Sequence, residues 1–78
     1  SEDEAAGMVV QVLSKAAPYA GAKGVILGLE NHGGVTDYAR TIEKIVRKVN
    51  SPWVGVNLDT GNFRKDVLAQ IRQLIPLA

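Results

Sequence analysis

Several residue types are missing or scarce, and each absence narrows what this chain can be. The 78 residues include no cysteine, which excludes a disulfide framework, thiolate chemistry and a cysteine-based zinc site. A single histidine excludes a histidine-rich metal site. No apolar run approaches the ~18 residues of a membrane-spanning helix, so we expect no membrane segment. Nine basic residues against eight acidic ones leave a net charge of +1, so we also expect no nucleic-acid partner.

The beginning of the chain is acidic and carries no initiator methionine. The run SEDE at residues 1–4 lacks the basic start of a signal peptide, and we expect a cytoplasmic protein. The missing methionine indicates a chain that is processed or is a piece of something longer. Apolar residues make up 46% of the sequence, which is enough for one small packed core. We therefore expect a single partial domain over residues 1–78.

Three segments repeat apolar residues at the spacing of a helix face. The pattern predicts helices over residues 5–17, 36–49 and about 64–75. Pro18 and Gly21 are expected to end the first helix. Thr36 is expected to cap the start of the second helix through its hydroxyl, and Asn50 suits the left-handed position after that helix.

Two short apolar runs, at residues 25–30 and 53–59, are typical of buried strands. The second helix connects them, and such a βαβ unit has parallel strands. The fold class is therefore α/β, a helix-strand-helix-strand-helix segment. Two parallel strands are too few for an independent sheet. We expect either a segment of a larger α/β protein or a piece that pairs with a copy of itself.

Each predicted strand ends in a carboxylate, Glu30 in the first and Asp59 in the second. Alternation of side chains puts each acid on the face that carries glycine, opposite an aliphatic face. Neighbouring parallel strands lie ~5 Å apart, so acids at matched positions can share one cation, at the edge where α/β folds bind ligands. Carboxylate oxygens suit Mg²⁺ or Mn²⁺, and Zn²⁺ is an alternative. The other interpretation is that each acid caps the loop that follows it, through backbone N–H groups.

A glycine-flanked loop follows the first carboxylate and contains the single histidine, His32. Its imidazole can contact a substrate hydroxyl or transfer a proton, and the alternative is a side chain that is only solvated.

The triplet DTG at residues 59–61 also occurs in aspartic proteases. Those enzymes are nearly all strand, whereas roughly half of this chain has helical period. The helical pattern of the chain therefore disfavours the aspartic protease interpretation.

Two motifs at this separation resemble a known family. The segment LENHGG at residues 29–34, followed by a helix and then by SPWVGVNLDTGNF at residues 51–63, is similar to the sugar phosphate isomerase/epimerase family, the xylose isomerase-like (β/α)₈ TIM barrels. The resemblance covers nearly the whole chain, as about two βα units from the middle of a barrel. It implies that Glu30 and Asp59 bind a divalent metal, Mn²⁺, Mg²⁺ or Zn²⁺. It also implies that Glu30 takes part in proton transfer.

The resemblance implies substrate-facing positions for Asn31, His32 and Asn62, with His32 as a second catalytic candidate. In the family a His and a second Glu from later strands complete the metal site, and this chain ends before either, so we expect the 78 residues alone to be inactive. The implied parent is a metal-dependent isomerase or epimerase of a sugar or sugar phosphate, moving a proton or hydride next to a carbonyl. One alternative is a non-catalytic fragment that associates with itself or with the rest of the barrel. Another is a DNA-repair nuclease of the same superfamily, which needs several histidines.

Overall fold

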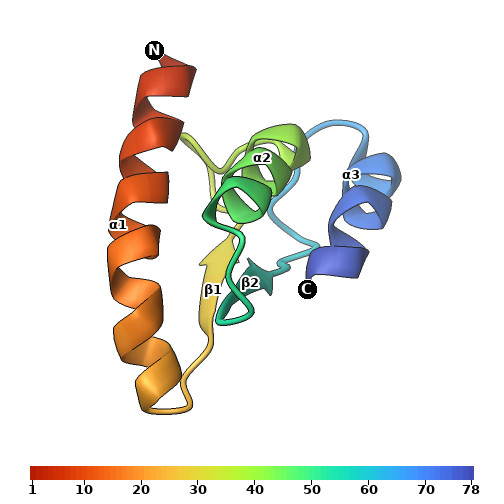
Figure 1. The fold of residues 1–78 in the computed structure, drawn as a ribbon. Coiled ribbons are helices and arrows are strands. Elements are labelled where there is room, and N and C mark those ends of the chain that lie inside the picture. The colour runs from red at the N-terminus through yellow and green to blue at the C-terminus, as the bar shows by residue number, and fades with distance from the viewer.

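The computed structural model describes residues 1–78 as three helices packed on a two-stranded parallel sheet (Figure 1). The elements, in chain order, are α1 (Glu2–Ala22), β1 (Leu27–Glu30), α2 (Ala39–Val49), β2 (Val54–Asn57), α3 (Val67–Leu74) and a 3₁₀ turn, η1 (Ile75–Leu77). This confirms the predicted α/β class and the order of the elements, with α2 as the crossover helix between the parallel strands. None of the helices combines the length and the apolar character that crossing a membrane requires.

The two faces of the sheet differ, as the alternation in the sequence predicts. The aliphatic residues of both strands pack into the core, where Val54 and Val56 are buried. The opposite face carries Gly28, Gly55 and Asn57, and Gly28 and Asn57 are exposed. One face therefore packs against the helices, and the other is exposed at Gly28 and Asn57, while the Leu77 carbonyl of η1 lies close to Gly55 on this second face.

The core lies between the sheet and the helices. Ile42 and Ile45 of α2 and Leu74 of α3 have no exposed surface. Burying a side chain of this kind contributes about 1.5 to 3 kcal/mol. Ala17 of α1 packs in one cluster with Ile42 and Leu74. The apolar stripe predicted on the second helix is thus the main packing surface of the fold.

The first helix is longer than predicted, because α1 runs through Pro18 to Ala22. The expectation that Pro18 ends the first helix is wrong. Proline removes one N–H, whose helical partner would be the carbonyl of Ser14. Both residues are exposed, so water can reach that carbonyl. At the other end the Ser1 hydroxyl accepts from the Glu4 N–H at 3.2 Å, which caps the helix.

Gly21 also lies inside α1 rather than after it. A Cβ at this position would overlap the ring of Trp53. Glycine therefore lets the half-buried indole pack directly on the helix, and this contact ties α1 to the segment that leads into β2.

The second helix begins at Ala39 rather than at Thr36, and the loop before it gives the reason. The Thr36 hydroxyl donates to the Gly33 carbonyl at 2.8 Å and accepts from the His32 N–H at 3.0 Å, which closes the loop on itself. The predicted cap is therefore wrong. Instead, the side-chain oxygen of Gln70 in α3 accepts from the Ala39 N–H at 2.6 Å, which satisfies a free donor at the start of α2.

Other element boundaries differ from the prediction by a few residues. The first strand begins at Leu27, and β2 spans Val54–Asn57, so each strand is shorter than its apolar run. Helix α3 begins at Val67, after Asp66 takes a left-handed backbone with φ 48°. The left-handed turn predicted at Asn50 is confirmed, with φ 51°.

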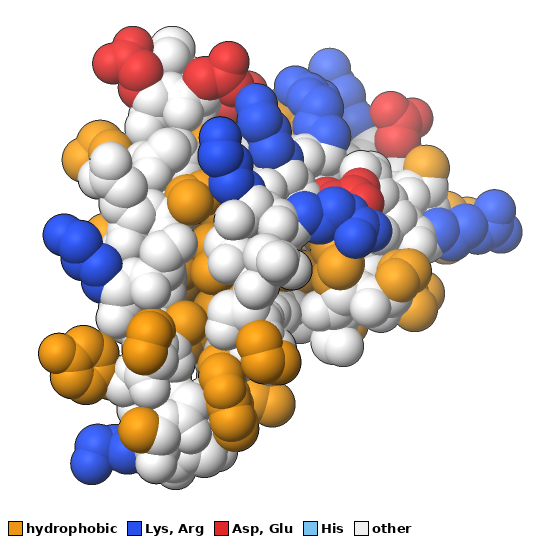
Figure 2. Space-filling model, in the orientation of Figure 1, with side chains coloured by type: hydrophobic (Ala, Val, Ile, Leu, Met, Phe, Trp, Pro, Cys, Tyr) orange, Lys and Arg blue, Asp and Glu red, His pale blue; other side chains and the backbone are white.

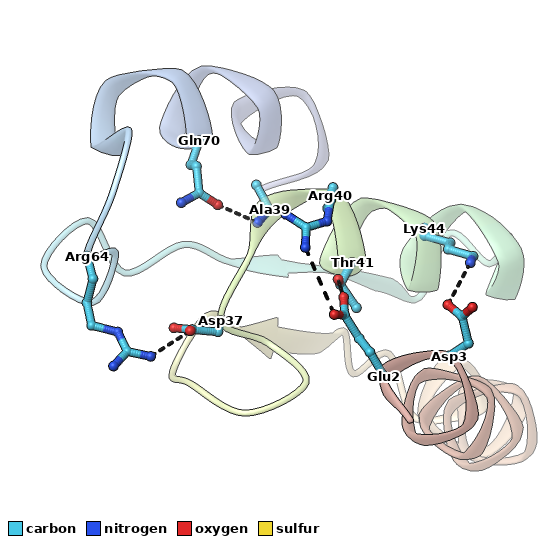
Figure 3. Close-up of polar contacts among 9 residues, drawn as sticks. All are labelled: Glu2, Asp3, Asp37, Ala39, Arg40, Thr41, Lys44, Arg64 and Gln70. Carbon is cyan, nitrogen blue, oxygen red and sulfur yellow. Dashed lines mark hydrogen bonds and ion pairs between the residues drawn. The ribbon is translucent and has the colours of Figure 1, made fainter.

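Ion pairs join the N-terminal end of α1 to α2. Lys44 Nζ lies 3.2 Å from an Asp3 carboxylate oxygen, and Arg40 lies 4.0 Å from Glu2 (Figure 3). Figure 2 shows acidic side chains over this end of α1 beside Lys and Arg side chains over α2. Because these side chains are largely exposed, each pair contributes at most about 1 kcal/mol. The apolar core, rather than these pairs, holds the helices together.

Candidate functional site

The carboxyl ends of the two strands bring the predicted acids to one edge of the sheet. Glu30 is the last residue of β1, and across the parallel ladder it pairs with Asn57, the last residue of β2. Asp59 lies beyond the end of β2, so the expectation that the two acids occupy matched positions is wrong by two residues. Leu58 still packs against the core, which favours for Asp59 the same face as for Glu30.

The Glu30 carboxylate is half-buried and has no partner within the chain. It joins none of the ion pairs or side-chain hydrogen bonds of the structure. A Cβ at Gly28, on the same face, would lie 3.1 Å from the Cβ of Asn57, so glycine leaves room for the asparagine side chain. Without an internal partner, both oxygens of this carboxylate are free to bind a ligand.

Asp59 uses one carboxylate oxygen within its own loop. Its Oδ1 accepts from the Gly61 N–H at 2.9 Å. This is the loop cap that the alternative interpretation predicts for both acids, and the structure shows it at Asp59 and not at Glu30. The second oxygen of Asp59 has no hydrogen bond within the chain and is available to a ligand.

The side chain of Asn31 turns into the protein. It is 1% exposed, and its Nδ2 donates to the Asp59 carbonyl while its Oδ1 accepts from the Asp59 N–H, both at 2.7 Å. Asn62 Nδ2 in turn donates to the Asn31 carbonyl at 2.9 Å. Both polar atoms of the Asn31 amide are therefore engaged, and they join the loop after β1 to the loop after β2.

His32 and Asn62, the other residues of the predicted substrate loops, line one hollow of about 280 Å³ together with Gly33, Asp37 and Arg64. The Arg64 guanidinium pairs with the Asp37 carboxylate at 2.6 Å (Figure 3). Sequence reasoning missed this pair, because no motif links residues 27 positions apart. The lining is polar and contains both donors and acceptors, a combination that suits hydroxyl groups.

The chain holds no group of three or more His, Cys, Asp or Glu side chains placed to bind a metal. Glu30 and Asp59 offer carboxylate oxygens, which are the donors that Mg²⁺ and Mn²⁺ prefer. The residues therefore fit such an ion in donor type, and a complete site at this edge needs further ligands.

An edge formed by the carboxyl ends of parallel strands is where TIM barrels build their active sites. The family model described as "Xylose isomerase-like TIM barrel" matches residues 1–75 of the chain. The chain belongs to the xylose isomerase-like TIM barrel family. No curated protein and no solved structure matches this xylose isomerase-like chain significantly.

Membership of the xylose isomerase-like TIM barrel family explains why the sheet has two unlike faces. In such a barrel eight strands close into a ring, helices cover its outside, and the inner face is lined by side chains. The aliphatic face under the helices is thus the outer face. The face that carries Gly28, Glu30 and Asn57 is the one that barrel closure turns inward. The family and the three helices also remove the aspartic protease interpretation of the DTG triplet.

Proposed function

We propose that this chain supplies part of the active site of a divalent-metal-dependent isomerase or epimerase that acts on a sugar or sugar phosphate. The observation that carries the proposal is Glu30, a half-buried carboxylate without a partner at the carboxyl end of a barrel strand. Barrel enzymes assemble their sites at this end from several strands. Membership of the xylose isomerase-like family supports isomerase or epimerase chemistry.

Glu30 and Asp59 are the proposed metal ligands. Glu30 and the free oxygen of Asp59 would hold Mn²⁺, Mg²⁺ or Zn²⁺ together with ligands from elsewhere in the barrel. Such an ion, when bound, polarises a carbonyl and the adjacent hydroxyl as a Lewis acid. Asn57, which pairs with Glu30 across the ladder, offers an exposed amide that can orient a substrate hydroxyl.

Proton movement is assigned to Glu30 and His32. Glu30 acts as the base toward the carbon next to the carbonyl, because its carboxylate has no competing partner in the chain. His32 is exposed on the rim of the hollow and can exchange a proton with a substrate oxygen. His32 and Asn62 are the proposed contacts to sugar hydroxyls. We assign no substrate contact to the Asn31 side chain, since both of its polar atoms bond to backbone.

A second candidate function is association without catalysis. Ile26 is 67% exposed next to β1, and each strand of the two-stranded sheet has one unpaired edge. Unpaired strand edges are templates for pairing with further strands. The partner we propose is the remaining strands of a barrel, with a second copy of the chain as the competing outcome. Sedimentation velocity tests this, and a stable monomer with no affinity for itself or for barrel strands contradicts it.

The test of the enzyme proposal is Glu30→Gln in the whole protein, which keeps the size of the side chain and removes its charge and basicity. With Mn²⁺ supplied and a panel of aldoses, ketoses and their phosphates as substrates, we expect turnover to be abolished. Glu4→Gln is the control, because Glu4 is an exposed carboxylate in the first turn of α1. Turnover close to normal in Glu30→Gln would end the proposal.

The second ligand has its own pair of variants. Asp59→Asn should weaken Mn²⁺ binding, measured by the electron paramagnetic resonance signal of the free ion. Asp66→Asn should leave it unchanged, because Asp66 is an exposed acid whose left-handed backbone asparagine also tolerates. Equal binding in the Asp59 and Asp66 variants contradicts the assignment of Asp59 as a ligand.

A further inference from the structure

We infer that Asn31 is a positioning residue, whose amide pairs with the backbone of Asp59 and thereby fixes the Asp59 carboxylate relative to Glu30. The inference rests on the proposed function, because the position of the Asp59 carboxylate relative to Glu30 matters to a reaction only where both carboxylates bind a common ligand.

The first observation is where the ladder stops. The pairing of β1 with β2 ends at Glu30 and Asn57. Beyond it, the chain after β1 enters the loop that Thr36 closes, so no strand pairs with Asp59. The Asn31 amide takes the place of that strand, donating to and accepting from the same residue at 2.7 Å. A primary amide resembles a peptide group, with a donor on one side and an acceptor on the other, so it extends the pairing by one step.

The second observation is how completely this arrangement holds Asp59. The Asn31 side chain is 1% exposed, so water does not compete for its two bonds. From the other side, the Gly61 N–H holds Asp59 Oδ1. Asn62 adds a bond to the Asn31 carbonyl. The backbone and one carboxylate oxygen of Asp59 are thus held by hydrogen bonds, and the second oxygen is free.

The molecule contains a control for this argument in Gln70. Its amide is also buried, accepting from the Ala39 N–H at 2.6 Å and donating to the Lys65 carbonyl at 2.8 Å. The first bond joins α3 to α2, the second stays within the segment that leads into α3, and neither touches a carboxylate of the proposed site. Replacing Gln70 with Ala therefore also removes two bonds to backbone and leaves the surroundings of Asp59 as they are.

The first measurement is hydrogen–deuterium exchange by mass spectrometry on the whole protein without metal. In Asn31→Ala, exchange in peptides that span residues 57–63 should rise on the order of tenfold, because the Asp59 backbone loses its partner. In Gln70→Ala, exchange should rise instead over residues 36–42, at the start of α2. Unchanged exchange over residues 57–63 in Asn31→Ala would overturn the inference.

The second measurement is Mn²⁺ affinity in the same proteins. Asn31→Ala should weaken it about 10-fold to 100-fold, the usual effect of losing a residue that orients a metal ligand. Gln70→Ala should leave it unchanged. In the Asp59→Asn background, Asn31→Ala should cause no further loss, because Asn31 acts only through Asp59. Asn31→Ser, which keeps one hydroxyl for bonding, should show a smaller loss in the same direction and serves if the alanine variant does not fold.

The outcomes separate the two proposals. Wild-type Mn²⁺ affinity in Asn31→Ala, or an equal loss of affinity in Gln70→Ala, overturns the inference and leaves the proposed function standing. Absence of Mn²⁺ binding by the unaltered protein overturns the proposed function and the inference with it.

Discussion

Two buried amides, Asn31 and Gln70, make the same kind of contact in two regions of the molecule. Each accepts a hydrogen bond from a backbone N–H and donates one to a backbone carbonyl. Asn31 does so at the carboxyl edge of the sheet, where both bonds go to Asp59. Gln70 does so in α3, where one bond goes to Ala39 at the start of α2 and the other to Lys65 in the segment just before α3.

The difference lies in what the contacted backbone carries. The Ala39 N–H is one of the free donors at the start of a helix, and Gln70 satisfies it, which serves stability. Asp59 carries a carboxylate with one free oxygen, so under the proposed function the same contact would also position a metal ligand. A buried amide that bonds to backbone thus stabilises the segment it contacts. Only the identity of the contacted residue indicates whether function also depends on that contact.

The largest expected effect is in the region of Gln70. Leu74 lies one turn later on α3 and has no exposed surface, so Leu74→Ala should lower the free energy of unfolding by about 2 to 5 kcal/mol. Urea denaturation measures this. Leu68→Ala is the control, because Leu68 is 71% exposed on the same helix and should change stability by less than about 0.5 kcal/mol.

The same variant tests whether the two regions are independent. If they are, native-state exchange in Leu74→Ala rises over α3 and stays unchanged over residues 57–63. An equal rise in both segments would show that α3 and residues 57–63 unfold together. Asn31 and Gln70 would then not belong to independent regions.

A smaller effect separates the two amides by charge. Gln70→Glu and Asn31→Asp both bury a carboxylate and both lose a donor, so both should be destabilised. Each new carboxylate keeps one backbone N–H donor and faces one backbone carbonyl, that of Lys65 at position 70 and that of Asp59 at position 31. Only the carboxylate at position 70 also lies at the positive end of the α2 dipole. We therefore expect Asn31→Asp to lose on the order of 1 kcal/mol more than Gln70→Glu. Urea denaturation near neutral pH measures the difference, and the reverse order would contradict this account.

The two regions also show how far a sequence can be interpreted. The parallel strands, the apolar stripe of α2 and the position of Glu30 at the end of β1 follow from local periodicity and element order, and the structure confirms them. The position of Asp59 does not follow in the same way, because β2 ends two residues before it. The contact of Asn31 with Asp59 depends on the register of the ladder, which local patterns do not encode. The cap that Gln70 provides comes from 31 positions away and has no local signal.

Two local rules failed for physical reasons. Thr36 precedes a helix and is a good capping residue, but its hydroxyl bonds within its own loop. Pro18 normally breaks a helix, but it stands where water can satisfy the carbonyl it leaves free. In both cases the result depends on competing partners that only the folded chain supplies.

The smallest expected effect lies on the α2–α3 contact that Gln70 also bridges. Glu43 of α2 accepts from Gln73 Nε2 at 2.8 Å and from Arg47 Nε at 2.7 Å. The Gln73 hydrogen bond, followed by the Arg47 hydrogen bond, holds the pKa of Glu43 below its usual value of 4.5. Because the pKa is lowered in the folded state, this carboxylate stabilises the fold above about pH 4.5, and its contribution is lost as pH falls through the lowered pKa.

Glu43→Gln keeps an acceptor for Gln73 and removes the titration. Below about pH 4.5, the urea midpoint should therefore fall less steeply with decreasing pH in this variant than in the unaltered protein. Asp66→Asn removes an exposed carboxylate elsewhere, and the slope should remain as it is. If both variants reduce the pH dependence of the urea midpoint equally, that dependence reflects the total charge of the protein and not the contacts of Glu43. The α2–α3 contact would then differ from the contact of Asn31 with Asp59 only through the neutral amide of Gln70.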